Sequence, residues 1–153
     1  ATLTSLNSAG YIFLDKKVGK TGSFYRDSPT SIVVTSDYAY IENVRTIDKA
    51  RRNIYANVLD LVNSPLYVDA DMGKLSEATI AVFRNETLKP LEAMAADGEI
   101  SVSGTGALPE TTVTIDPDQN VLSTSTINIV VRLVPVGVAR TIAFSIGFSI
   151  NVN

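Results

Sequence analysis

Apolar and polar residues alternate strictly along the last part of the chain. The even positions from 142 onward are all apolar: Ile142, Phe144, Ile146, Phe148, Ile150 and Val152. The odd positions between them are all small or polar. A period of two places every apolar side chain on one face of a β-strand, and no helix matches it. The pattern therefore predicts a long strand in residues 139–153 with one apolar face.

This predicted strand is too long for the sheet of a small domain. Its alternating run, residues 141–153, spans about 40 Å at about 3.3 Å per residue, whereas strands usually have about 5–6 residues. A terminal segment is also poorly ordered unless a contact holds it. We therefore expect an arm that pairs either with the first strands of the same chain or with a neighbouring subunit. The candidate interface residues are Ile142, Phe144, Ile146, Phe148 and Ile150.

A second alternating run precedes the arm, with apolar residues at positions 127, 129, 131 and 133. The two runs are joined through Pro135, Val136 and Gly137. Proline has no N–H to donate to a strand ladder, and glycine tolerates a large backbone change. We expect these three residues to form a hinge at the root of the arm.

Two helices are predicted in the middle of the chain. In residues 42–62, apolar residues recur three and four positions apart, as on one helical face. The residues expected to lie buried against a sheet are Ile47, Ile54, Val58 and Leu61. The second helix should begin after the N-cap Ser76 and end near Gly98. Pro90 inside it predicts a kink or a break.

Short apolar runs elsewhere predict further strands. They lie at residues 11–14, 24–26, 31–35, 66–68, 99–102 and 111–115. The order of strands, two helices and strands indicates an α+β fold with a mixed or antiparallel sheet and both helices on one face. We expect residues 1–138 to form one core domain and residues 139–153 to form the long C-terminal β-arm.

Composition and charge argue against several function classes. The chain has no Cys and no His, which removes disulfides, thiolate chemistry and the commonest general base. Its net charge is −3, and all acidic residues lie at or before Asp118. The tail from Gln119 carries only Arg132 and Arg140. An acidic body argues against nucleic acid as the main partner. No apolar run approaches the roughly 18 residues of a membrane helix, so we expect no membrane contact.

Three short motifs resemble ligand sites, and each lacks a required residue. Residues 19–21 look like the end of a phosphate-binding loop, but Leu14 stands where its first glycine belongs. Residues 116–120 carry the alternating oxygens of a calcium loop, but Val121 replaces its glycine. Residues 69–73 are a similar half-match. We expect turns and helix caps at all three, and no catalytic residue, metal or cofactor.

Three basic residues lie opposite the apolar stripe of the first helix. They are Arg45, Lys49 and Arg52, at helical spacing. A solvated helix face and pairing with acidic residues of a neighbouring subunit are about equally favoured by the sequence.

Several short motifs, in their order along the chain, resemble the C-terminal portion of contractile phage tail sheath proteins. The most telling is Arg45-Thr46-Ile47-Asp48-Lys49-Ala50, which opens the first helix. The others are Gly10-Tyr11, Gly22-Ser23-Phe24, Thr35-Ser36-Asp37-Tyr38, Gly98-Glu99-Ile100, Val134-Pro135-Val136 and the final alternating strand. The resemblance covers nearly the whole chain and is nearest to a divergent tail-sheath-like group of phages and prophages. It implies the later part of a longer protein.

The resemblance implies a structural subunit and no enzyme. Sheath subunits form a six-fold helical cylinder around an inner tube, and their terminal arms add strands to the sheets of neighbours. The implied partners are other sheath subunits, tail tube proteins and baseplate proteins. The implied location is the virion, assembled in the bacterial cytoplasm.

Two other classes remain open from the sequence. One is a non-viral module that exchanges strands, such as a pilus or surface-layer subunit. The other is a small ligand-binding or regulatory domain with a closed sheet. In that case the chain's own helices would cover Phe144 and Phe148, and the chain would be a monomer.

Overall fold

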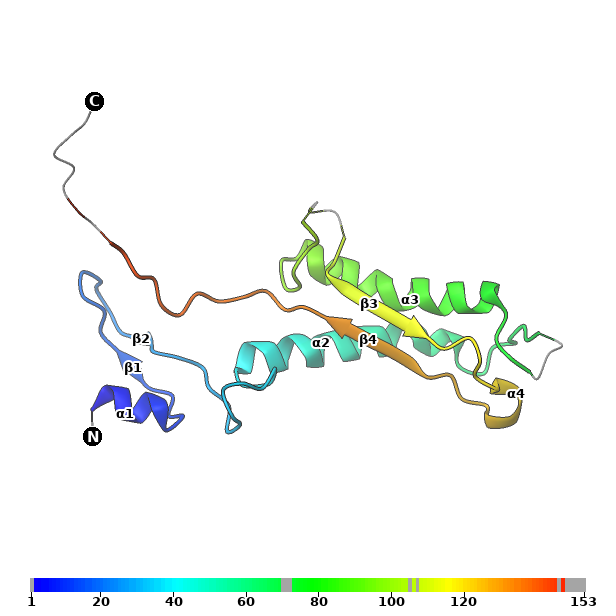
Figure 1. Cartoon of the computed structure of the whole chain (residues 1–153), viewed down its shortest axis with the longest axis horizontal. Coiled ribbons are helices and arrows are strands. Elements are labelled where there is room, and N and C mark those ends of the chain that lie inside the picture. The colour runs from blue at the N-terminus through cyan, green and yellow to red at the C-terminus, as the bar shows by residue number, and fades with distance from the viewer. Residues whose placement is uncertain (1, 70–72, 105, 107, 146, 148–153) are drawn as a thin grey trace, which may run out of the picture.

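Two long helices form the centre of the molecule in the computed structural model, which describes residues 2–69, 73–104, 106, 108–145 and 147. Helix α2 (Ile41–Val58) and helix α3 (Glu77–Ala96) pack against each other along their lengths. They run in opposite directions (Figure 1). The shorter elements η1 (Leu59–Leu61) and α4 (Val121–Thr124) lie in the connections.

An antiparallel hairpin covers one face of this helix pair. It consists of β3 (Thr111–Ile115) and β4 (Ile129–Leu133), with Val113 opposite Val131. Alternate residues of both strands pack towards the helices, while Val130 and Arg132 on β4 are exposed. The period of two read from the sequence is therefore correct here. The fold is α+β, with both main helices on one face of the antiparallel hairpin.

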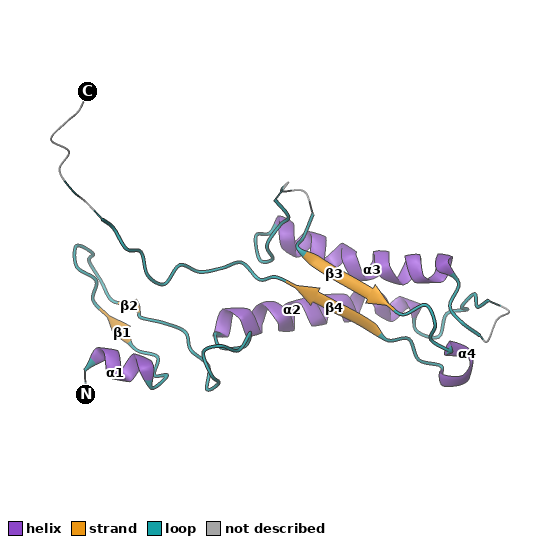
Figure 2. Cartoon of the chain, viewed as in Figure 1, coloured by secondary structure: helices purple, strands orange, loops and turns teal. Residues whose placement is uncertain are grey.

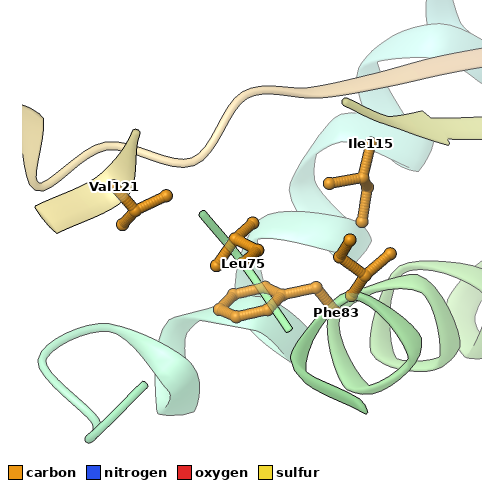
Figure 3. Close-up of a cluster of buried hydrophobic side chains, with 5 residues drawn as sticks. Leu75, Phe83, Ile115 and Val121 are labelled. Carbon is orange, nitrogen blue, oxygen red and sulfur yellow. The ribbon is translucent and has the colours of Figure 1, made fainter. Parts of the chain in front are cut away.

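Two clusters of apolar side chains hold these layers together. The first cluster contains Leu75, Ile80, Phe83, Ile115 and Val121 (Figure 3). The second cluster contains Ala50, Leu91, Met94 and Ile100. Helix α3 contributes to both clusters, and its Leu91 is 0% exposed. Helix α3 is therefore the main support of the core.

Helix α2 is less well covered than its apolar stripe predicted. Only Ala50 is fully buried on this helix. Ile54 and Val58 are half-buried, although they pack against the core clusters. The prediction that the whole stripe is buried was wrong because the hairpin has two strands and is too narrow to cover both helices.

The ends of α3 follow the sequence signals. The Ser76 Oγ accepts a hydrogen bond from the Thr79 N–H at 3.3 Å, as an N-cap does. At the other end, Gly98 has a φ of 74°, and its N–H donates to the Ala95 carbonyl. The Glu99 N–H donates to the Met94 carbonyl at 2.9 Å. This pair of bonds is a Schellman motif, which needs a left-handed residue such as glycine.

Helix α3 continues through Pro90 without a break, contrary to one of the two outcomes expected from the sequence. Proline has no N–H, so the Glu86 carbonyl loses its partner four residues on. The Asn57 Nδ2 of helix α2 donates to this carbonyl at 3.1 Å and also to the Glu86 carboxylate at 3.3 Å. A side chain of the neighbouring helix thus replaces the missing backbone donor.

Replacing Asn57 with Ala should cost about 1 kcal/mol of unfolding free energy, because the Glu86 carbonyl would lose its donor. In a Pro90→Ala background the residue 90 N–H can bond this carbonyl, so the same Asn57→Ala change should cost less. Urea unfolding of the four proteins in this double-mutant cycle measures the difference. An equal cost in both backgrounds would show that Asn57 does not compensate for the proline.

The N-terminal residues lie beyond the start of α2, away from the β3–β4 hairpin (Figure 1). They form the short helix α1 (Leu3–Ser8) and a small antiparallel hairpin of β1 (Leu14–Asp15) and β2 (Phe24–Tyr25). The Arg26 guanidinium bonds the Asp15 carboxylate at 2.7 Å across this hairpin. Strands were expected at both places but are shorter than predicted.

Several predicted strands are not strands in the isolated chain. Residues 31–35 form turns, and their apolar side chains are exposed because no sheet lies beside them. Residues 66–68 and 99–102 make only single bridges. Residues 139–145 and 147, predicted as the first half of the arm strand, have no regular structure because no partner strand lies beside them. The remaining arm positions fall outside the described residues.

Candidate functional site

An apolar groove of about 880 Å³ runs along the open side of β4. Its wall on helix α2 includes Ile47, Ala50, Ile54 and Val58. Its wall on the hairpin includes Ile129, Val131, Leu133 and Pro135. Apart from the buried Ala50, the α2 side chains in this wall are ones that the narrow hairpin leaves partly uncovered. The groove is therefore the part of the core that lacks a covering element.

The strand β4 has an open edge beside this groove. One edge pairs with β3, and within the described part of the chain no strand pairs with the other edge. An open edge presents unpaired N–H and C=O groups that another strand can bond. The groove and the edge together can accept one extended segment with one apolar face.

Two of the predicted interface residues lie in a segment that contacts neither the groove nor a strand. This segment, residues 136–145, is an extended loop that runs past the start of α2 (Figure 2). Ile142 is 69% exposed and Phe144 is 81% exposed. The other predicted interface residues, Ile146, Phe148 and Ile150, lie outside the described residues. The described part of the arm thus presents large apolar side chains to solvent.

The predicted hinge is fixed at its first residue. The Ser101 Oγ donates to the Pro135 carbonyl at 2.9 Å, and the Ser101 N–H donates to the Val134 carbonyl at 2.9 Å. Val136 is 44% exposed, and no atom would meet a Cβ at Gly137 within 4 Å. The hinge stays a prediction, and the contacts place its free part at Val136 and Gly137.

Arg140 attaches the arm to the segment that precedes α2. Its Nε donates to the Asp27 Oδ1 at 2.8 Å, and its Nη2 bonds the Glu42 Oε1. Its guanidinium also lies 3.4 Å from the centre of the Tyr40 ring, in a cation–π contact. We call this group of Arg140, Asp27, Glu42 and Tyr40 the Arg140 clasp.

Ser28 orients both carboxylates of the Arg140 clasp. Its Oγ donates to the Glu42 Oε2 at 2.5 Å, and its N–H donates to the Asp27 Oδ1 at 2.8 Å. Partial burial raises the pKa of Glu42, but the bond from Ser28 and the charge of Arg140 outweigh it, so the pKa lies below its ordinary value of 4.5. Partial burial likewise lowers the pKa of Arg140, and the two carboxylates raise it above its ordinary value.

The Arg140 clasp should open in acid. Because the pKa of Glu42 is lower in the folded chain than its ordinary 4.5, its contribution is complete above pH 4.5 and is lost as the pH falls through the lower folded value. Amide NMR signals of residues around Arg140 should shift in that range. In Glu42→Gln they should not show this titration step, and an identical step in that variant would assign it to another group.

The Arg140 clasp was missed in the sequence analysis. Its acidic members lie more than 90 positions before Arg140 and carry no motif. One signal was present, since Arg140 is an isolated charge in an otherwise almost uncharged tail. Such a charge between apolar residues needs a partner or solvent.

Two of the three weak ligand motifs form turns and caps, as predicted, whereas residues 70–72 of the third motif lie outside the described residues. Gly19 has a φ of 77° in a turn, the Asp118 N–H bonds the Asp116 side chain at 2.9 Å, and Asn120 caps α4. Among the described residues, no group of three or more His, Cys, Asp or Glu side chains could hold a metal ion. No described helix is long and apolar enough to cross a membrane.

Of the three basic residues on α2, Lys49 has an acidic partner in the same chain. Its Nζ lies 2.6 Å from the Glu99 carboxylate, just after α3. Lys49 therefore joins the middle of α2 to the residues just after α3, a contact that the sequence does not predict.

Comparison with known proteins gives one family and one structural likeness. Residues 37–153 match the family described as "DUF2586, C-terminal domain". A comparison with curated proteins finds no match. Among solved structures, the chain is similar to a chain in "Cryo-EM structure of the anti-feeding prophage (AFP) baseplate, 6-fold symmetrised", with a TM-score of 0.60 and 18% identity. The likeness covers 80% of this chain and 32% of that chain, and it shows a shared fold.

Proposed function

Because the chain belongs to the family of DUF2586 C-terminal domains, we propose that it is a structural, non-enzymatic subunit of a contractile injection system. More specifically, we propose a sheath subunit that joins its neighbours by exchanging strands and drives contraction. The shared fold with a chain from a prophage baseplate supports the first part. The motif order that resembles tail sheath proteins supports the second part.

The proposal rests on one observation. The chain contains an arm that can be donated as a strand and a site that can accept a strand, but this arm and this site do not contact each other. The acceptor is the apolar groove with the open edge of β4. The donor is the arm, whose apolar face includes the exposed Ile142 and Phe144. A strand added to an edge gains main-chain hydrogen bonds, and its alternate side chains fix its register. The arm of one copy can therefore supply the apolar side chains and main-chain partners that are missing at the groove and β4 edge of another copy.

The sizes of donor and acceptor agree. Strand β4 has 5 residues, so an added strand needs about 17 Å of extended chain. The described arm from Arg140 onward supplies such a length. Filling the groove would bury Ile142 and Phe144, which contributes about 1.5–3 kcal/mol for each fully buried side chain. The gain is large enough to support a specific contact.

The contact between donor and acceptor is heterologous, since the two surfaces differ. A head-to-tail contact of this kind generates a ring if its rotation closes and a helical assembly if it does not. A sheath cylinder needs such a contact. Contraction would then move the subunits as rigid bodies about the free residues Val136 and Gly137.

Two alternatives have a specific observation for or against them. A baseplate subunit is favoured by the origin of the similar structure, a baseplate. A closed ligand-binding domain would cover Phe144 with the chain's own helices, whereas Phe144 is 81% exposed. The baseplate role is thus the second candidate.

Immunogold electron microscopy of particles from a producing cell tests the proposal. An antibody against this chain should label the tail cylinder along its whole length if the chain is a sheath subunit. Gold confined to one end of the tail would favour the baseplate role. Particles without label, in a preparation where an antibody against another tail protein does bind, would contradict both roles.

A further inference from the structure

An arm attached to β4 has a competing target, which is the groove of its own chain. Strand β4 ends at Leu133, and a two-residue turn suffices to reverse an antiparallel strand. An arm that turned at Val136 and Gly137 would return along the open edge of β4. Closing such a short loop within one chain costs less entropy than bringing two chains together. An unrestrained arm would therefore fill its own groove before it reached a neighbour.

The contacts at both ends of residues 136–139 prevent this return. At one end, the carbonyls of Val134 and Pro135 bond Ser101. At the other end, Arg140 bonds Asp27 and Glu42, next to the first turn of α2. The segment between these contacts is drawn out past the end of the hairpin, in the direction in which β4 already runs (Figure 1). A reversal of the chain requires the Arg140 contacts to break.

We propose that Arg140 is a specificity-determining residue: its clasp directs the arm away from the groove of its own chain and towards a second copy. The inference rests on the proposed function, because it assumes that a strand-exchanging arm fills the groove of a neighbour. In this inference, Arg140 determines whether the arm enters the groove of its own chain or the groove of a second copy. The clasp adds no contact with the neighbour itself.

The chemistry of the clasp requires arginine. Its guanidinium offers separate N–H groups to two carboxylates and a flat face to the Tyr40 ring. A lysine has one compact charge and could keep only part of these contacts. Ser28 already holds both carboxylates in position, so their side chains lose little conformational entropy when Arg140 binds them.

Distances between two spin labels test this inference. The chain contains no cysteine, so labels can be placed at will. One label replaces Ala143 on the arm, and the other replaces the exposed Ala56 on α2, the helix that forms one wall of the groove. In dilute protein, Arg140→Gln should raise the short-distance, folded-back population about tenfold, as expected for losing a charge-assisted contact. Arg140→Lys should give an intermediate value.

Arg84→Gln is the matched control, because it removes the same charge from the exposed face of α3. It should leave the distance distribution unchanged. If Arg140→Gln and the unaltered chain give the same distribution in dilute protein, the clasp does not direct the arm and the inference is wrong.

A second measurement separates this inference from the proposed function. Copies labelled only at position 143 are mixed with copies labelled only at position 56, at high concentration. Short distances between copies of the unaltered chain support strand exchange. Their absence, together with a folded-back Arg140→Gln, would contradict the exchange and leave the directing role of the clasp intact. Their presence, without fold-back in Arg140→Gln, would contradict the clasp alone.

Discussion

A chain that ends at Arg140 should associate with other copies at least about 100-fold more weakly than the whole chain. The cut removes Ile142 and Phe144, and each contributes about 1.5–3 kcal/mol when it is fully buried. Each 1.4 kcal/mol changes an association constant tenfold. The cut leaves the Arg140 clasp, both core clusters and the acceptor groove in place. Sedimentation velocity over a range of concentrations measures both constants.

Ser145→Pro should weaken the association in the same way without shortening the chain. Proline removes one main-chain donor from the added strand and is poorly tolerated within a sheet. Ser145→Ala is the matched control, because it keeps the N–H and removes only the hydroxyl. Equal association constants for the whole chain, the truncated chain and Ser145→Pro would show that the arm does not connect the copies.

Replacing Leu91 with Ala should lower the free energy of unfolding by about 2–5 kcal/mol, as for other fully buried leucines. Leu91 is 0% exposed and lies in the cluster that joins α2, α3 and Ile100. For a chain of this size, such a loss corresponds to a melting temperature lower by roughly 5–20 °C. Thermal unfolding followed by far-UV circular dichroism measures it.

Two variants on the main helices calibrate this prediction. Val82→Ala changes a residue of α3 that is 48% exposed, so it should have a small effect. Ile54→Ala changes the half-buried wall of the groove and should cost less than Leu91→Ala in the isolated chain. A cost of Leu91→Ala no larger than that of Val82→Ala would mean that this cluster does not support the fold.

Local signals in the sequence were enough to predict the main layers. The apolar patterns predicted both strands of the hairpin, Thr111–Ile115 and Ile129–Leu133, but not that these two strands pair with each other. Ser76 and Gly98 gave the ends of α3, because capping depends on residues close in sequence. These features need no knowledge of distant contacts.

Features that depend on distant residues could not be predicted. Residues 31–35 have strand-like composition, but no sheet reaches them. Pro90 was expected to disturb α3, and the donor that compensates it, Asn57, lies on another helix. In the sequence Arg140 is only an isolated charge, since its carboxylate partners are far away in the chain. The arm pattern is clear in the sequence, and its strand needs a partner that one chain does not contain.

The Arg140 clasp also sets the path along which mechanical force would enter the subunit. Tension applied to the arm reaches Arg140 first and passes through its two ion pairs into the residues around the start of α2. While the clasp is closed, its ion pairs take part of the load that would otherwise reach the β3–β4 ladder. Because Asp27 follows the β1–β2 hairpin directly, the arm and the N-terminal segment share one anchorage point. Tension on the arm thus passes in part into α2 through Glu42, and less of it reaches the β3–β4 strands.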